Sequence, residues 1–337
     1  MLKLVHLANG RPHGGLFPQI FLDALKGIGE LEMIEGGKDL GDEEKLKIFQ
    51  GADVAITGWN SASLPTALAE NPGKLGYVCN LTGTMSGFVP SEIVASPIKV
   101  SNWGDCPSFS IAEGAMALLL STLKDVHAQV MSLREGNWSL RGPGFGGSLF
   151  QAEVGVYGCG AIGRRFIHLL KAFGPEIAVF DPYCDDVPEG CQRVDSLEEL
   201  FKGRQVISIC AGLSDETRGS VSADLLALLP DHGVIVNTAR GEIIDQDALF
   251  AELESGRLRA GLDVVVPDGV LPKDHPVRHW KNCIISCHDI NRGWPGNGEP
   301  PKKIGYMHQV CLNNLKAYGE GEPIKFEMDL ERYLRST

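Results

Sequence analysis

The sequence lacks the features that mark a membrane protein. A transmembrane helix needs about 20 consecutive apolar residues. No apolar run in the 337 residues of this chain approaches that length. The segment 1–8 is too short for the apolar core of a signal peptide with its cleavage site, so we expect a first β-strand there. We therefore expect no membrane among the partners of the chain.

The chain also lacks an excess of basic residues. Its 31 Lys and Arg are outnumbered by 43 Asp and Glu, which gives a formal net charge of -12. A general nucleic-acid-binding protein needs a basic surface for phosphate contacts, so we expect no nucleic acid as a partner. The length is comfortable for two domains, each able to bury its own core.

The nine cysteines show no pattern typical of disulfides or of a metal site. Their number is odd and their spacing irregular, which in a long chain indicates reduced thiols and a cytoplasmic protein. Cys283 and Cys287 lie close together beside His288, but no second ligand pair with metal spacing follows them. We therefore expect no metal ion. The sequence contains no internal repeat or low-complexity tract either.

What the sequence does contain is a glycine-rich turn near its middle. Gly158, Gly160 and Gly163 form a GxGxxG pattern between a strand-like run at 153–157 and an amphipathic segment at 161–173. In a dinucleotide site the first glycine permits a tight turn, the second lets the backbone approach a pyrophosphate, and the third lets the helix pack closely. The helix N-terminus attracts phosphate. A structural turn is the alternative, and the flanking patterns favour the nucleotide site.

Asp181 ends the next apolar run, at 177–180. A carboxylate in this place accepts hydrogen bonds from the adenosine ribose and repels a 2'-phosphate. The sequence therefore predicts NAD, rather than NADP, as the cofactor.

Strand-like and helix-like segments alternate along the chain, which predicts an α/β fold. From residue 152 onward their order is typical of a doubly wound parallel sheet. The strand-like segments lie at 2–8, 53–57, 76–79, 153–157, 177–180, 206–210, 233–237, 260–265 and 283–286. Residues 110–120 are apolar around most of a helix, so we expect a buried helix there. A last helix-like stretch covers 302–318.

Polar residues lie at or after the ends of several of the later strand-like runs: Arg240, Asp268 and His288 follow such runs, and Asp263 lies inside the run at 260–265. Ligands bind at the carboxyl ends of the strands in such a sheet. An arginine can hold a carboxylate through two parallel hydrogen bonds. An imidazole, whose ordinary pKa is about 6.5, can exchange a proton near neutral pH. Taken singly, Arg240 could be a surface charge and Asp268 a turn residue, so only the joint pattern favours hydride-transfer chemistry.

These motifs resemble those of the D-isomer-specific 2-hydroxyacid dehydrogenase family over residues 101–290. The matching segments are Ser110–Glu113, Arg134–Trp138, Thr217–Gly219 and, most characteristically, Asn237–Gly241. The resemblance implies an oxidoreductase that transfers a hydride between NAD(H) and the C2 of a D-2-hydroxy acid or 2-keto acid. It implies Arg240 as the substrate-binding arginine, His288 as the acid/base, and Asp263 as a partner of the nicotinamide carboxamide. Asp268 would orient His288.

The resemblance also implies two domains. Residues 101–289 would form a Rossmann cofactor domain, and residues 1–100 with 290–337 a smaller, flavodoxin-like α/β substrate domain. The segment 134–147, with Trp138 and Phe145, would suit a homodimer, although a packing role within one chain stays open. The predicted cofactor contacts are Gly158, Gly160, Ala161, Ile162, Gly163, Asp181, Cys210, Ala211, Thr238 and Asp263. The predicted substrate contacts are Leu81, Thr82, Gly83, Thr84, Arg240, Arg292 and Trp59.

The sequence departs from the family pattern on the substrate side. The family usually has Glu followed by Pro where this chain has Asp268, so the carboxylate loses one methylene of reach. After the histidine the family prefers small residues, whereas this chain has bulky ones at 289–295. Arg292 could meet a second anionic group or pair with Asp289, and Trp294 could line the pocket or pack between domains.

The third departure follows the loop at 80–87. By its position this loop resembles the one that, in the family, receives the substrate carboxylate on its backbone N–H groups. The acidic sequence that the family shows after this loop is replaced by Phe88–Pro90. The identity of the acid therefore stays open, as does the direction of the reaction. Two alternatives also remain: an NAD-sensing, corepressor-like protein on the same fold, and a dehydrogenase of an unusual donor such as a sugar acid, formate or phosphite.

Overall fold

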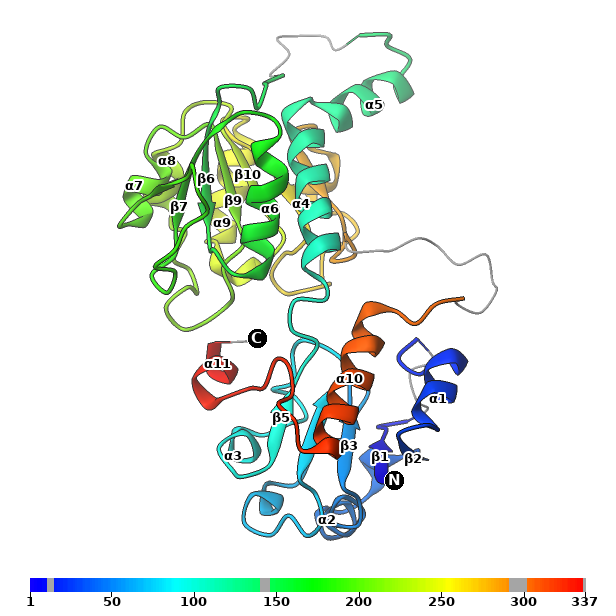
Figure 1. Ribbon diagram of the computed structural model, residues 1–337. Helices are drawn as coiled ribbons and strands as arrows, with labels where there is room; N and C mark the ends of the chain where they lie inside the picture. Colours follow the sequence, from blue (N-terminus) through cyan, green and yellow to red (C-terminus); the bar gives the residue numbers. More distant parts are fainter. Residues whose placement is uncertain (11–14, 140–145, 291–301, 336–337) are drawn as a thin grey trace. The chain divides into compact units, whose positions relative to one another are not determined.

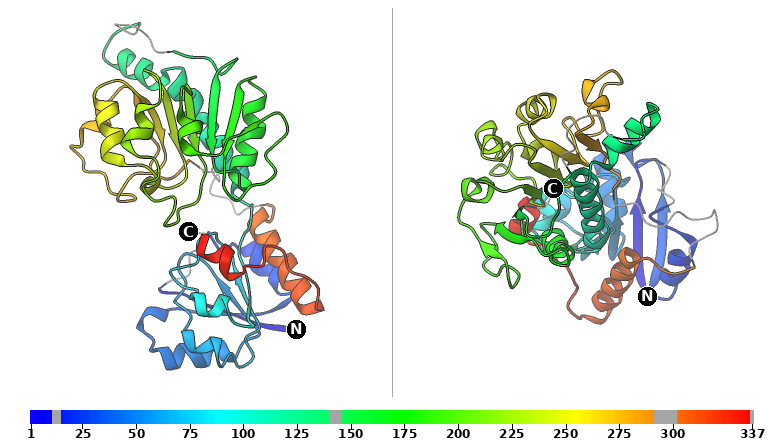
Figure 2. Two further views of the ribbon diagram at one scale, coloured as in Figure 1. Left: turned by 90° about the vertical axis from the view of Figure 1, so that its left-hand side faces the viewer. Right: turned by 90° about the horizontal axis from the view of Figure 1, so that it is seen from above.

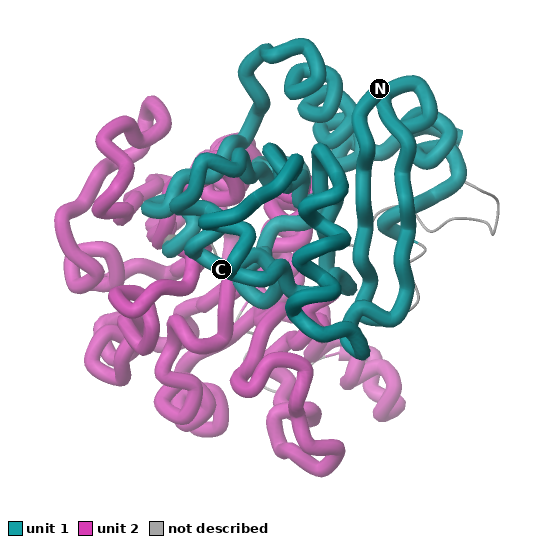
Figure 3. Tube along the Cα trace, turned by 90° about the horizontal axis from the view of Figure 1, so that it is seen from below, with its two compact units in different colours: residues 1–106, 294–337 teal, residues 107–293 magenta. Residues whose placement is uncertain are grey.

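The computed structural model describes residues 1–10, 15–139, 146–290 and 302–335. The chain divides into two compact units, residues 1–106 with 294–337 and residues 107–293 (Figure 3). The first unit therefore combines both ends of the chain. The second is one continuous segment.

The first unit contains a five-stranded parallel sheet in the order β2-β1-β3-β4-β5 (Figure 1). Its strands are β1 (Leu2–Leu7), β2 (Gly29–Ile34), β3 (Val54–Thr57), β4 (Tyr77–Asn80) and β5 (Lys99–Ser101). Its helices are α1 (Gln19–Leu25), η1 (Gly37–Asp39), α2 (Asp42–Gln50), η2 (Thr66–Ala69), α3 (Ser91–Val94), α10 (Tyr306–Glu320) and α11 (Leu330–Arg335). Every residue of β3 and β4 is buried.

Both faces of this sheet are covered, which explains why its central strands are continuous apolar runs. On one face, Leu4 and Ile56 pack with Phe21 of α1 and Leu315 of α10. The other face forms a second apolar cluster, which includes Phe49 of α2, Leu68 of η2 and Ile93 of α3.

The second unit contains a seven-stranded parallel sheet in the order β12-β11-β10-β9-β6-β7-β8. Its strands are β6 (Glu153–Tyr157), β7 (Glu176–Phe180), β8 (Gln192–Arg193), β9 (Val206–Ile209), β10 (Val234–Asn237), β11 (Arg259–Leu262) and β12 (Cys283–Ile285). Its helices are α4 (Ser108–Leu123), α5 (Val126–Arg134), α6 (Ala161–Lys171), α7 (Leu197–Phe201), α8 (Ala223–Ala227), η3 (Gly241–Ile243), α9 (Gln246–Glu254) and η4 (Pro276–His279).

Helices cover both faces of this sheet (Figures 1 and 2). Leu119 of α4 and Phe166 of α6 pack on one face against apolar side chains such as Val156. The cluster on the other face contains Phe201 of α7 and Leu253 of α9, together with residues of α8. The predicted doubly wound sheet and the second α/β unit are thus confirmed. The strand order reverses between β6 and β9, and ligands bind at such a switch point.

The predicted buried helix at 110–120 lies within α4, which packs against α6, β10 and β11 in the second unit. The last helix-like stretch forms α10 and belongs to the first unit. None of the helices in the described ranges is long and apolar enough to span a bilayer.

Candidate functional site

The glycine-rich turn joins β6 to α6 at the switch point of the larger sheet. Gly158 has a φ of 99°, a conformation that only glycine adopts easily, and a Cβ there would lie 2.6 Å from the Cα of Ala211. A Cβ on Gly163 would overlap the carbonyl oxygen of Gly158. A Cβ on Gly160, in contrast, would meet no atom of the described chain within 4 Å. Gly160 therefore faces open space.

The N-terminus of α6 is open to an anion. Its first residues are Ala161 and Ile162, and the preceding Gly160 offers no side-chain cap. The N–H groups of the first helical turn have no partner within a helix, and here the helix dipole adds positive potential. The open space at Gly160 thus adjoins a set of donors that suits a pyrophosphate.

Asp181, directly after β7, lies against the glycine-rich turn. Its Oδ2 accepts a hydrogen bond from the backbone N–H of Cys159 at 2.6 Å, and its Oδ1 accepts one from the N–H of Tyr183 at 2.9 Å. Each carboxylate oxygen has a second lone pair. The turn therefore holds Asp181 in place and leaves it able to accept hydrogen bonds from ribose hydroxyls.

The strands β9 and β10 contribute the next predicted cofactor contacts. Ala211 lies against Gly158, and burial raises the pKa of the neighbouring Cys210 to about 11. The Oγ1 of Thr238 is buried and finds no hydrogen-bond partner in the described part of the chain. A buried hydroxyl without a partner is costly, so this orphaned group fits a site that a polar ligand completes.

The thiols near these strands are not suited to nucleophilic or metal chemistry. Burial is the main cause that raises the pKa of Cys159 to about 12, and it does the same for Cys283. Both thiols therefore remain protonated near neutral pH. Within the described ranges, no three His, Cys, Asp or Glu side chains form a group that could hold a metal ion.

Arg240 lies in a turn that Asn237 stabilises. The side chain of Asn237 accepts from the N–H of Ala239 at 3.0 Å and donates to the carbonyl oxygen of Arg240 at 2.9 Å. The Nη1 of Arg240 donates to the carbonyl oxygen of Ala239 at 2.8 Å. The half-buried guanidinium is thus held close to the carboxyl end of β10.

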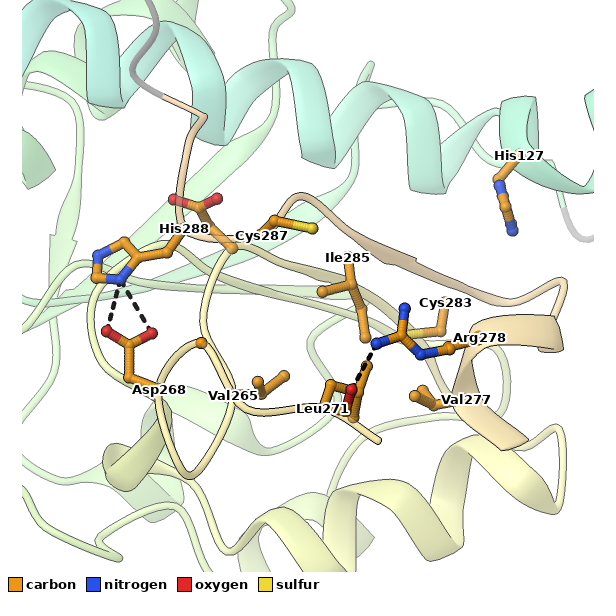
Figure 4. A pocket seen from close by; sticks show the side chains of 12 residues that line it. His127, Val265, Asp268, Leu271, Val277, Arg278, Cys283, Ile285, Cys287 and His288 are labelled. Atoms are coloured by element: carbon orange, nitrogen blue, oxygen red, sulfur yellow. Dashed lines mark hydrogen bonds and ion pairs between the residues drawn. The ribbon is translucent and has the colours of Figure 1, made fainter. Parts of the chain in front are cut away.

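His288 and Asp268 meet in the structure. The Nδ1 of His288 lies 2.8 Å from Oδ2 and 3.0 Å from Oδ1 of Asp268, and both side chains are partly exposed. Figure 4 shows them facing each other. A carboxylate on Nδ1 favours the tautomer with its proton there and leaves Nε2 for a reactant. The loss of one methylene relative to Glu does not prevent the contact.

The pair lines a cavity of about 330 Å³ within the second unit, which is within the usual range for small-ligand sites. Asp263, whose exposed fraction is 5%, also lines this cavity. The other lining residues are His127, Val265, Gly269, Leu271, Val277, Arg278, Cys283, Ile285 and Cys287. Arg240 is not one of them, so the structure groups His288, Asp268 and Asp263 but leaves Arg240 outside this cavity.

In the first unit, the loop 81–84 follows β4. Leu81 and Thr82 are buried, while Gly83 and Thr84 are partly exposed. The backbone N–H groups of residues 82–84 donate to no acceptor among the described residues. Such a set of unused donors suits a carboxylate.

Two tryptophans lie beside this loop. The rings of Trp59 and Trp103 are 5.8 Å apart and nearly perpendicular, and Trp59 is 58% exposed. A Cβ on Gly83 would lie 2.6 Å from the Nε1 of Trp103, so this glycine permits the close approach of an indole. The sequence reasoning identified Trp59 and Gly83 but missed Trp103, because only the fold brings the three together.

Three residues discussed from the sequence, Phe145, Arg292 and Trp294, lie outside the described residues. The structure adds others that the sequence reasoning missed. Ser286 donates to Asp263, and Gly114 of α4 faces Ile290. A glycine inside a helical pattern was the signal available for Gly114, since such a residue often has a packing reason.

Several known proteins are similar to this chain in sequence or in fold. The sequence profile described as "D-isomer specific 2-hydroxyacid dehydrogenase, NAD binding domain" matches residues 116–289. A D-3-phosphoglycerate dehydrogenase of Methanocaldococcus jannaschii is 32% identical over 270 residues, which cover 79% of this chain and 51% of that protein. The chain thus spans about half the length of that relative.

Two further relatives match over nearly their whole length. A glyoxylate reductase/hydroxypyruvate reductase of Homo sapiens is 30% identical, with 86% of this chain and 95% of that protein covered. The crystal structure of an NADPH-dependent glyoxylate/hydroxypyruvate reductase from Sinorhizobium meliloti superposes with a TM-score of 0.74 at 23% identity. That match covers 99% of this chain and 98% of that one, and it establishes likeness of fold.

Proposed function

The chain belongs to the D-isomer specific 2-hydroxyacid dehydrogenase family and is an oxidoreductase of that family, and on this premise we propose how its residues act. The reaction is a hydride transfer between a nicotinamide cofactor and the C2 of a D-2-hydroxy acid or 2-keto acid. The observation that carries the proposal is the contact between His288 and Asp268 in a cavity that Asp263 also lines.

The cofactor lies along the carboxyl ends of the larger sheet. Gly158, Gly160 and Gly163, with the first residues of α6, hold the pyrophosphate. Cys210 and Ala211 border the adenosine, and Thr238 offers its unpartnered hydroxyl to the nicotinamide ribose. When bound, the nicotinamide ring donates or accepts the hydride.

Asp181 makes NAD the preferred cofactor. Its carboxylate is fixed by the N–H groups of Cys159 and Tyr183 and accepts hydrogen bonds from the ribose hydroxyls. A 2'-phosphate would place a second negative charge against it. An NADPH-dependent reductase shares this fold, so the fold does not determine the cofactor and the proposal depends on Asp181.

The substrate carboxylate is held by cationic and backbone donors. Arg240 offers a planar fork that matches two oxygens, and the unused N–H groups of residues 82–84 offer further hydrogen bonds. Trp59, which is 58% exposed beside the loop 81–84, is a further substrate contact in this proposal. Arg292, predicted from the sequence as a further anion contact, keeps that role in the proposal.

His288 moves the proton. In the reduction it donates a proton to the carbonyl oxygen while the hydride adds to C2, and in the oxidation it takes the proton from the hydroxyl group. Asp268 stabilises the charged imidazole and fixes its tautomer. Asp263 contacts the nicotinamide carboxamide and so keeps the ring next to His288.

A screen of substrates tests this function. The purified chain is assayed with 2-hydroxy and 2-keto acids, including sugar acids and phosphorylated ones, with NAD(H) and NADP(H) in parallel. We expect turnover of at least one D-2-hydroxy acid with NAD, and much slower turnover of the analogue that lacks the carboxylate. Activity with NADP alone would refute the role of Asp181, and equal rates without the carboxylate would refute that of Arg240.

We further propose a homodimer. Val126, Val130 and Leu133 on α5 form an exposed apolar stripe, and Trp138 beyond the helix is 94% exposed. Exposed apolar patches of this kind mark protein interfaces. Sedimentation at micromolar concentration should give the mass of two chains, and Val130→Glu should give one; a monomeric wild type would contradict the proposal.

The cysteine content of the sequence supports a cytoplasmic location. The nine cysteines are odd in number and irregularly spaced, which indicates reduced thiols. Thiols stay reduced in a reducing compartment. Fractionation of the source cells should place the protein in the cytoplasm, and a periplasmic or secreted pool would contradict this.

A further inference from the structure

His288 lies in an unusual backbone turn. Cys287 and His288 have φ values of 62° and 55°, so two consecutive residues other than glycine adopt the left-handed conformation. Such residues persist there only when their surroundings restrain them. The direction of the imidazole therefore depends on whatever holds residues 286–290.

Asp263 restrains the turn from the side of the sheet. Its carbonyl oxygen accepts from the N–H of His288 at 2.6 Å. Its Oδ1 accepts from the Oγ of Ser286 at 2.7 Å and from the N–H groups of Asp289 at 3.0 Å and Ile290 at 3.2 Å. One residue at the end of β11 thus binds the turn on both sides of the histidine.

Helix α4 restrains the turn through packing. A Cβ on Gly114 would lie 2.5 Å from Cγ1, 2.9 Å from Cγ2 and 2.9 Å from the carbonyl oxygen of Ile290. No real Cβ tolerates such distances, so Ile290 occupies the space that a side chain at position 114 would need. The gap at Gly114 and the bulk of Ile290 are complementary.

The helix cannot easily move away from Ile290. Ala115, Leu118 and Leu119 of α4 are buried in the apolar cluster that includes α6 and the sheet. Interiors of this density transmit a displacement instead of absorbing it. A side chain at position 114 would therefore push the turn, which is the less firmly packed of the two elements.

We propose that Gly114 is a positioning residue for the acid–base reaction. The space that it leaves in α4 receives Ile290, and this contact sets the turn so that Nδ1 of His288 meets Asp268. The inference rests on the proposed function of His288. It also accounts for one way in which this chain departs from the family pattern. The family prefers small residues after the histidine, and this chain has Ile290 there.

The experiment compares Gly114→Ala, Ile290→Ala and the double variant. Ala is the better helix former, so Gly114→Ala should not lower the thermal midpoint through the helix itself. We expect it to lower kcat by roughly tenfold to 100-fold, the range for a small misplacement of a catalytic group. The affinity for NADH and the KM of the keto acid should stay close to those of the wild type.

Rescue distinguishes positioning from a general structural defect. Ile290→Ala removes both Cγ atoms that a Cβ at position 114 would strike and leaves only the contact with the carbonyl oxygen of residue 290, so the double variant should recover part of the lost kcat. Gly319→Ala in α10 is the matched control, because a Cβ there would have only ordinary contacts with Leu2, the nearest at 3.6 Å. We expect that control to keep the wild-type kcat.

Two results would overturn the inference: wild-type kcat in Gly114→Ala, or a loss of kcat that Ile290→Ala does not relieve. Failure of the proposed function gives a different result. In that case His288→Asn keeps its turnover, whatever Gly114→Ala does.

Discussion

The Nδ1 of His288 lies within hydrogen-bond distance of both carboxylate oxygens of Asp268, at 2.8 Å from Oδ2 and 3.0 Å from Oδ1. The two residues come from different strand ends, Asp268 from the segment after β11 and His288 from the turn after β12. The contact therefore depends on the register of two neighbouring parallel strands. It gives the imidazole the carboxylate partner that an acid–base role needs.

Asp268→Asn keeps the size of the side chain and removes its charge. Because the charged imidazole then loses its partner, we expect kcat to fall by at least about tenfold, towards the roughly 10²–10⁴-fold that an acid–base group contributes. Steady-state kinetics of keto-acid reduction measure this. Asp274→Asn changes an exposed aspartate of the same segment and should leave kcat unchanged. Equal kcat in wild type and Asp268→Asn would refute the role of the carboxylate.

Arg240→Lys keeps a positive charge but loses the planar fork. One charge-assisted hydrogen bond to the substrate carboxylate is then lost, so the KM of the keto acid should rise by about tenfold or more. The affinity for NADH, measured by fluorescence titration, should not change. Arg193→Lys on the exposed edge strand β8 serves as control. An unchanged KM would show that another group anchors the carboxylate.

Asp181→Ala removes the carboxylate beside the glycine-rich turn. Hydrogen bonds to a charged group contribute about 1.5–3 kcal/mol, so kcat/KM for NAD should fall by roughly tenfold to 100-fold. Repulsion of the 2'-phosphate is lost as well, and NADP should be used better than by the wild type. Parallel assays with both cofactors give the ratio. An unchanged ratio would contradict the NAD preference that we assign to this residue.

The acid stability of the first unit depends on two buried histidines. Burial is the main cause that lowers the pKa of His6 and of His308 below the ordinary value. Their hydrogen bonds, 2.9 Å each, join Nδ1 of His6 to the carbonyl oxygen of Ile56 and Nε2 of His308 to that of Leu16. In the unfolded chain each imidazole has a pKa of about 6.5. Below this pH the unfolded state therefore binds more protons than the folded state. Stability is therefore lost as the pH falls.

Thermal denaturation at pH 7, 6 and 5 checks this expectation. The midpoint of the wild type should fall over this range. That of His308→Gln should fall less steeply, because one of the histidines whose pKa burial lowers no longer titrates. His168→Asn replaces an exposed histidine of α6 and should keep the wild-type slope. The same slope in His308→Gln would show that burial of this imidazole has no effect on acid stability.

The sequence predicts most of the central strands, because buried parallel strands are continuous apolar runs. The runs at 206–210 and 233–237 correspond to β9 and β10. Three strands gave no such signal and were not expected: β8 is the exposed pair Gln192–Arg193, β2 alternates with two glutamates, and β5 has only three residues. These three strands form because they pair with neighbouring strands, and the pattern of their own side chains does not predict them.

The candidate site shows the same limit. His288 and Asp268 can be identified as polar residues that follow apolar runs and Asp263 as a polar residue inside one, and the structure places all three at one cavity. The contact of Gly114 with Ile290 joins segments far apart in the sequence, so its existence depends on how α4 packs against the sheet. The interaction of Trp103 with Trp59 beside Gly83 depends in the same way on tertiary packing.

The most direct test of the central claim compares His288→Asn with the wild type, with His279→Asn as an exposed control. Turnover of a D-2-hydroxy acid is measured beside the affinity for NADH. If His288 moves the proton, its replacement should lower kcat by at least about 100-fold and leave the affinity for NADH unchanged. The control His279→Asn should behave as the wild type. Unchanged turnover in His288→Asn would contradict the account.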